Sequence, residues 1–211
     1  MTASSLSRRC VLAGGLIFAS AGLPSVALAQ SDDDMTIGAA TAPLHIIEYA
    51  SLTCPHCAQF HATNWRPLKE RYIDAGRVRF TLREMATPPA PVALAMFQLA
   101  RCQTSSPDLY LERVGILFER QQAILGTGTG AGVRDALLAI GAEWGLSPDQ
   151  IAACFNDPAG VQRMQRSVAV ARELGVNHTP SFIFNGVLDD DHDFQTPEGM
   201  VRILEARLAA L

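Results

Sequence analysis

The fold is decided by residues 44–57, LHIIEYASLTCPHC, in which a short apolar run leads directly into two cysteines separated by two residues. Residues 44–50 are rich in apolar and β-branched side chains, a composition typical of a buried strand. A helix is predicted from about Cys54 to Tyr72, because apolar side chains can form a stripe along that stretch. The cysteine pair is therefore expected where a strand meets a helix.

The next apolar segment, residues 78–82, alternates in polarity and predicts a second strand. Strand, helix and strand within about 40 residues form a βαβ unit, in which the two strands lie parallel. Pro67 is expected to kink the helix between them, because proline has no N–H and its ring clashes with the preceding turn. Residues 30–41, which precede the first strand, are expected to form a loose arm.

The segment from Val92 to about Gly175 is predicted to be helical, with breaks at stretches rich in Gly, Pro, Ser and Asn. The predicted helices are Val92–Cys102, Leu109–Ile124, Val133–Trp144, Pro148–Cys154 and Val161–Leu174. Asn185-Gly186 between two β-forming stretches then predicts a hairpin. A last helix is expected to begin at Thr196-Pro197-Glu198. The chain is therefore assigned to the α/β class.

Residues 1–29 have the pattern of an export signal. Arg8-Arg9 precedes a mostly apolar run that ends in Ala27-Leu28-Ala29, so a cationic start leads to an apolar middle and a small-residue cleavage site. Cleavage is expected after Ala29, following twin-arginine-like or Sec export, and a buried N-terminal helix is the alternative. Removal of this segment leaves Cys54, Cys57, Cys102 and Cys154 in a compartment where disulfides persist.

Composition excludes several classes of protein. The chain has 211 residues, of which 48% are hydrophobic, so it can build a core and is not disordered. Its formal net charge is −4 and it has no run of Lys or Arg, which argues against nucleic-acid binding. No apolar stretch of the sequence reaches the ~18–20 residues of a membrane span. One globular domain, with or without an insertion, is expected.

The motif Cys54-Pro55-His56-Cys57 carries the predicted chemistry. A sulfur in the first turn of a helix lies near free backbone N–H groups and the positive end of the helix dipole, so the pKa of Cys54 should be lowered. His56, when protonated, would add a positive charge beside that sulfur. Cys57 should be less exposed and should act as the resolving thiol. A stabilised reduced form makes the corresponding disulfide a strong oxidant.

Two other roles are compatible with such a motif. It can form half of a zinc site, with His45, His56 or His61 close in sequence, although the chain has no second CxxC or CxxH. It can also close an inert structural disulfide, although short strained loops tend to be reactive. No metal ligand set is predicted, and a metal-binding chaperone stays open as the alternative from another functional class.

The chain resembles the DsbA-like thiol:disulfide oxidoreductases of the thioredoxin superfamily over residues 36–211. The resemblance rests on Glu48-Tyr49, Thr53-Cys54-Pro55-His56-Cys57, Phe60, Thr179-Pro180-Ser181-Phe182 and Asn185-Gly186. It implies a thioredoxin fold with a helical domain inserted between the βαβ half and the ββα half. Residues 30–88 and 176–211 would then form the thioredoxin fold, and residues 89–175 the insertion.

The resemblance also implies roles for single residues. Thr179-Pro180 matches a cis-proline loop that lies beside the redox pair and offers backbone groups to an extended peptide substrate. Glu48 matches a buried acid that accepts the proton of the resolving thiol, the alternative being a carboxylate that reaches water. Cys102 and Cys154 match a structural disulfide of some members, which would add about 4 kcal/mol of stability, the alternative being two buried free thiols. His178 departs from the family pattern and is expected to be a solvated loop residue.

The function implied by the resemblance is that of a monomeric periplasmic enzyme. It would donate the Cys54–Cys57 disulfide to reduced, newly exported proteins, without a cofactor. A quinone-linked membrane partner of the DsbB type would reoxidise the cysteine pair. A periplasmic disulfide reductase or isomerase is the alternative among enzymes.

Overall fold

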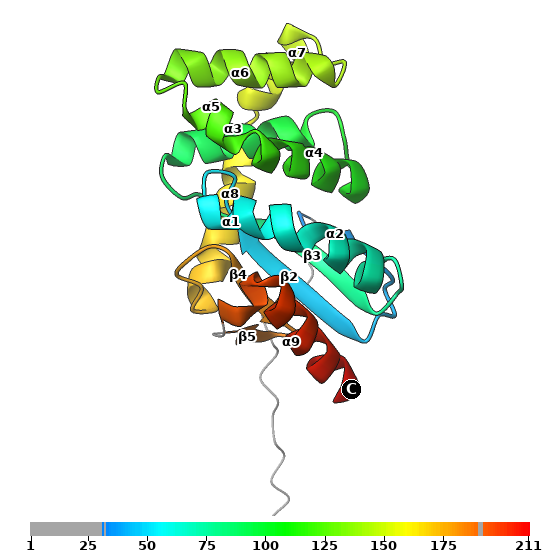
Figure 1. The fold of residues 1–211 in the computed structure, drawn as a ribbon. Helices are drawn as coiled ribbons and strands as arrows, with labels where there is room; N and C mark the ends of the chain where they lie inside the picture. The colour runs from blue at the N-terminus through cyan, green and yellow to red at the C-terminus, as the bar shows by residue number, and fades with distance from the viewer. Residues whose placement is uncertain (1–30, 32, 190–191) are drawn as a thin grey trace, which may run out of the picture.

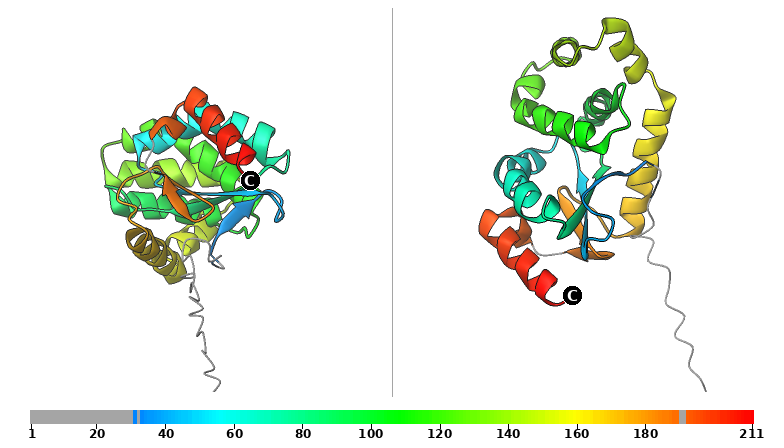
Figure 2. Two further views of the ribbon diagram at one scale, coloured as in Figure 1. Left: turned by 90° about the horizontal axis from the view of Figure 1, so that it is seen from below. Right: turned by 90° about the vertical axis from the view of Figure 1, so that its right-hand side faces the viewer.

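The computed structural model describes residues 31, 33–189 and 192–211 (Figure 1). The predicted export signal, residues 1–29, lies outside the described residues. Within them, the molecule consists of a central sheet with helices on both faces and a group of helices at one end (Figure 2). The predicted α/β fold, with helices inserted between two halves of a thioredoxin fold, is confirmed.

The central sheet has five strands in the described part of the chain. Their spatial order is β1 (Met35–Ile37), β3 (Val78–Glu84), β2 (Leu44–Ala50), β4 (Ser181–Phe184) and β5 (Val187–Asp189). Strands β2 and β3 are parallel, as the βαβ pattern predicts, with Ile46 opposite Phe80. The other neighbouring pairs are antiparallel. Strand β2 is therefore interior, and both of its faces can be buried.

Strand β1 corrects the prediction of a loose arm over residues 30–41. Met35 and Ile37 are buried, and β1 pairs with β3 along the edge of the sheet. Its Thr36 hydroxyl also lies 2.7 Å from the Thr81 hydroxyl of β3. Three residues are too few to give a recognisable alternation of polarity, so the sequence alone did not distinguish this strand from an arm.

The helix that follows the cysteine pair is continuous but alternates between α and π geometry. Its parts are α1 (Pro55–Phe60), the π-helical η2 (His61–Trp65), α2 (Arg66–Leu68) and the π-helical η3 (Lys69–Ile73). Pro67 lies between the two π segments, whose wider turns accommodate a ring that an α-helix would exclude. The helix packs with α9 (Pro197–Ala209) on one face of the sheet (Figure 1).

Six helices lie between β3 and β4 in the described residues. They are α3 (Ala90–Arg101), α4 (Pro107–Glu119), α5 (Gln121–Leu125), α6 (Gly130–Glu143), α7 (Pro148–Phe155) and α8 (Pro158–Glu173). Helix α8 returns along the sheet face opposite α1 and α9 (Figure 2). The 3-10 turn η4 (His192–Gln195) precedes α9.

The single helix predicted over Leu109–Ile124 is wrong, because the chain breaks between α4 and α5. Arg120 separates the two helices with φ −94° and ψ 2°, outside the α-helical region. Its guanidinium forms an exposed bidentate pair with Glu143 of α6. The break changes the direction of the chain at Gln121, which is buried as the first residue of α5.

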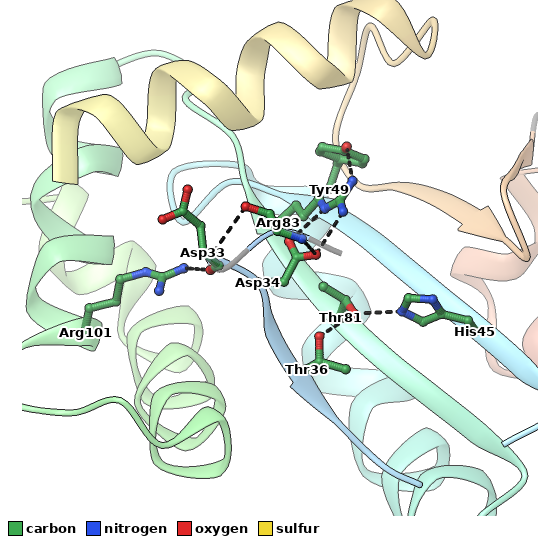
Figure 3. A network of polar contacts seen from close by, with 9 residues as sticks. Asp33, Asp34, Thr36, His45, Tyr49, Thr81, Arg83 and Arg101 are labelled. Atoms are coloured by element: carbon green, nitrogen blue, oxygen red, sulfur yellow. Dashed lines mark hydrogen bonds and ion pairs between the residues drawn. The ribbon is translucent and has the colours of Figure 1, made fainter. Parts of the chain in front are cut away.

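Asp33 and Asp34 tie the N-terminal segment to the sheet and to the helices (Figure 3). The Asp34 carboxylate accepts two hydrogen bonds of 2.9 Å from Arg83 of β3, and both side chains are buried. The carboxylate of Asp33 pairs with Arg166 of α8 at 2.8 Å, and its backbone carbonyl accepts a 2.9 Å bond from Arg101 of α3. We refer to these five residues as the acidic tie.

Substitution of Asp34 tests the acidic tie. The variant Asp34→Asn should lower the free energy of unfolding by about 3 kcal/mol, because it removes a buried carboxylate that forms two hydrogen bonds with the Arg83 guanidinium. Urea denaturation would measure this loss. The control Glu70→Gln makes the same chemical change in the exposed Arg66–Glu70 pair and should cost less than about 1 kcal/mol. Equal losses in the two variants would contradict the assignment.

Candidate active site

The cysteine pair lies where β2 ends and α1 begins. Cys54 is the N-cap residue of α1, with an extended backbone, and Pro55 takes the first helical position, where the missing N–H removes no helical hydrogen bond. The N–H of Cys54 donates to the Ser51 carbonyl at 3.0 Å, which closes a tight turn after β2. Free N–H groups of the first helical turn therefore surround the Cys54 side chain.

Cys54 is held against a loop that is distant in sequence. Its sulfur is 3.2 Å from the carbonyl oxygen of Thr179, and its side chain is mostly buried. The peptide bond between Thr179 and Pro180 is cis. The structure thus brings together the cysteine pair and the Thr179-Pro180 segment that the resemblance placed at the site.

The surroundings of Cys54 stabilise its thiolate. The pKa of Cys54 falls from 9.0 to about 5, chiefly because the Cys57 thiol donates a hydrogen bond to its sulfur. The backbone N–H groups of Cys57 and His56 lower this pKa further, whereas burial raises it. Cys54 is therefore an anion at neutral pH.

Cys57 has the opposite character. It is fully buried, and burial raises its pKa well above the usual value. The hydrogen bond to Cys54 and the negative charge of Glu48 raise the pKa of Cys57 further. The N–H of Ser51 approaches the Cys57 sulfur at 3.5 Å and acts in the other direction. The reduced pair therefore consists of one thiolate and one thiol.

Glu48 is fully buried on the side of β2 that faces α1. Alternation along the strand places it on the same face as Ile46 and Ala50. Its Oε2 lies 3.0 Å from Nε2 of His61, and its Oε1 has no hydrogen-bond partner. The carboxylate therefore does not reach water, which was the alternative at the sequence level.

His61 and Gln121 belong to the site, although sequence reasoning gave neither residue this role. His61 follows Cys57 by four residues, so helical spacing offered a signal for it. Gln121 comes from α5, and its buried amide donates to the carbonyls of Leu52 at 2.9 Å and of Cys54 at 3.0 Å. No local pattern predicts this contact, because it depends on the break before α5.

The other predicted histidines lie apart from one another. The His56 side chain is exposed, and its backbone N–H is the group that lowers the pKa of Cys54. His45 bonds the Thr81 hydroxyl at 2.8 Å (Figure 3), while burial first, and then Arg79 and Arg83, lower its pKa to about 4. His178 is exposed. In residues 31, 33–189 and 192–211, no group of three His, Cys, Asp or Glu side chains is placed to hold a metal ion.

Cys102 and Cys154 lie far from the redox pair in sequence and are joined by a disulfide. The bridge connects the end of α3 to α7 across a sequence separation of 52 residues.

Among the described residues, no helix is both long and apolar enough to cross a membrane.

Comparison with known proteins supports the fold. A family model for thioredoxin matches residues 30–206. A putative protein-disulfide oxidoreductase of Rickettsia prowazekii is 29% identical over 162 residues, which cover 76% of this chain and 57% of the relative. The chain thus spans little more than half the length of that relative.

Solved structures share the fold at low sequence identity. Alpha-DsbA1 of Wolbachia pipientis has a TM-score of 0.74 and 22% identity, with 88% of this chain and 96% of that chain covered. BdbD from Bacillus subtilis has a TM-score of 0.69 and 17% identity, with 84% and 94% covered. These likenesses show a common architecture that includes the helices between β3 and β4.

Replacement of Cys57 tests the source of the low Cys54 pKa. Cys57→Ala removes the donor to the Cys54 sulfur and should raise the pKa of Cys54 relative to the wild type. Cys57→Ser keeps a hydroxyl donor at the same position and should raise this pKa less. The rate of alkylation of Cys54, measured against pH, gives the midpoint for each protein. Equal midpoints for the Ala and Ser variants would show that the hydrogen bond is not the cause.

Replacement of Gln121 tests the contribution of α5 to the site. Gln121→Ala should lower the free energy of unfolding by about 1–3 kcal/mol, because it removes a donor from two backbone carbonyls that are inaccessible to water. It should also raise the pKa of Cys54, since the first turn of α1 loses its support. The exposed neighbour provides the control Gln122→Ala, which should change neither quantity. Indistinguishable behaviour of the two variants would remove Gln121 from the site.

Proposed function

The chain belongs to the thioredoxin family, and on that premise we propose that it is a DsbA-type thiol:disulfide oxidoreductase that introduces disulfides into exported proteins. The name of its Rickettsia relative, a putative protein-disulfide oxidoreductase, supports this activity. The redox centre is the sulfur pair of Cys54 and Cys57, and the reaction needs no cofactor.

The opposite pKa shifts of Cys54 and Cys57 carry this proposal. A stabilised Cys54 thiolate lowers the free energy of the reduced pair relative to the disulfide, so the disulfide tends to accept electrons. The same shift makes Cys54 a good leaving group, because thiols of low pKa leave readily. Both properties favour donation of a disulfide to a substrate over reduction of one.

The reaction proceeds through a mixed disulfide. A substrate thiolate attacks the Cys54 sulfur, since Cys57 is fully buried, and the Cys54–Cys57 bond breaks with its electron pair on Cys57. Cys57 then takes up a proton, for which buried Glu48 is the proposed donor and acceptor. A second substrate thiolate attacks the substrate sulfur of the mixed disulfide and releases the Cys54 thiolate. The substrate is oxidised by two electrons, and the cysteine pair is reduced.

The substrates that fit this site are reduced, unfolded segments of exported proteins. The Thr179-Pro180 loop lies against Cys54 and is the proposed contact for an extended peptide. The pattern of residues 1–29 supports export to the periplasm, where the protein would act as a monomer. A quinone-linked membrane protein of the DsbB type would reoxidise the pair.

Two alternatives have distinct experimental signatures. A disulfide reductase or isomerase would share the fold and the motif but would not require a strongly stabilised Cys54 thiolate. A metal-binding chaperone would retain metal on the reduced cysteine pair. The metal content of the purified reduced protein, with and without chelator, separates the second alternative from redox activity.

The reduction potential tests the proposed direction of electron transfer. Equilibration of the Cys54–Cys57 pair in glutathione buffers should give a potential above about −200 mV, and the oxidised protein should form a disulfide in a reduced dithiol peptide. Cys54→Ser should abolish that exchange. A potential near the ≈ −270 mV of thioredoxin would identify a reductase instead.

A further inference from the structure

The proton of Cys57 has to move within the protein interior. In the proposed reaction, Cys57 alternates between a disulfide sulfur and a thiol, yet its side chain has no exposed surface. Besides Cys54, the titratable group that acts on it is Glu48, whose charge raises the pKa of Cys57. The backbone N–H of Ser51 also approaches the sulfur but keeps its proton. The orientation of the Glu48 carboxylate therefore decides whether that proton can move.

His61 is the described residue that bonds the Glu48 carboxylate. Its Nε2 lies 3.0 Å from Oε2 of Glu48, and the two side chains are 4% and 0% exposed. His61 begins the η2 segment four residues after Cys57, so the two residues lie on neighbouring parts of one helix face. Glu48 reaches the same place from β2. One carboxylate thus contacts the imidazole and acts electrostatically on the resolving thiol.

The contacts of the His61 ring favour the tautomer that carries its proton on Nε2. Nδ1 of His61 is buried and has no hydrogen-bond partner. The ring packs against Phe118 of α4 at 4.4 Å and against Trp65 at 5.3 Å between centroids. A proton on Nδ1 would be buried without an acceptor, whereas the Nε2–H form leaves only a lone pair there. This form donates to Oε2 of Glu48 and leaves Oε1 of Glu48 unpartnered.

We propose that His61 is a positioning residue, whose Nε2–H holds Oε2 of Glu48 so that the unpartnered Oε1 exchanges a proton with the Cys57 sulfur through one bridging water. This inference rests on the proposed function. When Cys57 attacks the mixed disulfide at Cys54, its S–H proton passes to Oε1, the Cys54–Cys57 bond forms, and the other thiol leaves as a thiolate. In the reverse step, the Cys54–Cys57 bond breaks, Cys57 leaves as a thiolate, and Oε1 returns the proton to its sulfur.

Two charged groups act on the pKa of Cys57 in the described part of the chain, the Glu48 carboxylate and the Cys54 thiolate. Strand β2 contributes Glu48, and α1 contributes the Cys54 thiolate. The neighbour of His61 from α4 is Phe118, which is apolar. A change at His61 therefore acts on Cys57 through Glu48.

Titration of Cys57 in variants of His61 tests the proposal. In His61→Leu, Glu48 loses the donor that holds it in place, so its charge acts less on Cys57 and the pKa of Cys57 should fall below its wild-type value. His61→Gln retains an N–H donor and should keep the pKa of Cys57 near that of the wild type. The control Phe118→Leu disturbs the packing of the ring but not its polar contact, and should also have little effect. Titration of ¹³Cβ-labelled cysteine by NMR in the reduced full chain measures these values.

The rate of escape from a mixed disulfide provides a second readout. A glutathione adduct on Cys54 should be released by Cys57 about 10- to 100-fold more slowly in His61→Leu at neutral pH than in the wild type, because the loss of a positioned proton acceptor outweighs the larger thiolate fraction of Cys57. His61→Gln should restore the rate to within about threefold of the wild type. A purely structural role is indicated if His61→Leu leaves both the rate and the Cys57 titration unchanged, or if Phe118→Leu changes them equally. Either result overturns the proposal.

If His61→Leu does not fold, a measurement on the wild-type protein tests the proposal instead. The ¹⁵N NMR spectrum should show the His61 ring protonated at Nε2 and bare at Nδ1, and an imidazolium or the other tautomer would overturn the proposal. These measurements need no protein substrate. If the wild type fails to oxidise a dithiol peptide while the His61 results hold, the proposed function fails and the positioning role stands.

Discussion

The hydrogen bond from the Cys57 thiol to the Cys54 sulfur is the interaction on which the site depends. It lowers the pKa of Cys54 and raises that of Cys57, so it fixes which sulfur is the anion. The bond requires Cys57 to keep its proton, and full burial beside the charge of Glu48 ensures this. An interior strand is needed to bring a carboxylate to that depth, and β2 provides it between β3 and β4.

Distant segments hold this bond in place. The Thr179 carbonyl contacts the Cys54 sulfur from the loop before β4, and the Gln121 amide binds the Cys54 carbonyl from the inserted helices. His61, the first residue of the π-helical segment that follows α1, binds Glu48. The insertion therefore contributes to the candidate site itself, because a residue of α5 supports the backbone of Cys54.

The sequence predicted the features that depend on local pattern and left open those that depend on packing. Residues 44–57 predicted the buried strand and the helix N-terminus, because hydrophobic periodicity and the CxxC position are local signals. Strand β1 was missed because three residues carry no periodicity. The Gln121 contact was missed because it follows from the turn at Arg120, which no glycine or proline marks. The partner of His61 depends on which face of β2 meets α1, and only the register of the sheet settles this.

The acidic tie has a consequence for how a client protein would be recognised. Asp33 and Asp34 connect β3, α3 and α8. These contacts link the sheet to the inserted helices and oppose hinge motion between them. If the proposed activity holds, a molecule braced in this way would offer a surface of constant shape beside Cys54, and conformational adjustment would fall to the polypeptide that binds there. A disordered chain can make that adjustment, whereas a folded domain would first have to open. Discrimination in favour of unfolded clients would then arise from the stiffness of the enzyme, without any sequence-specific pocket.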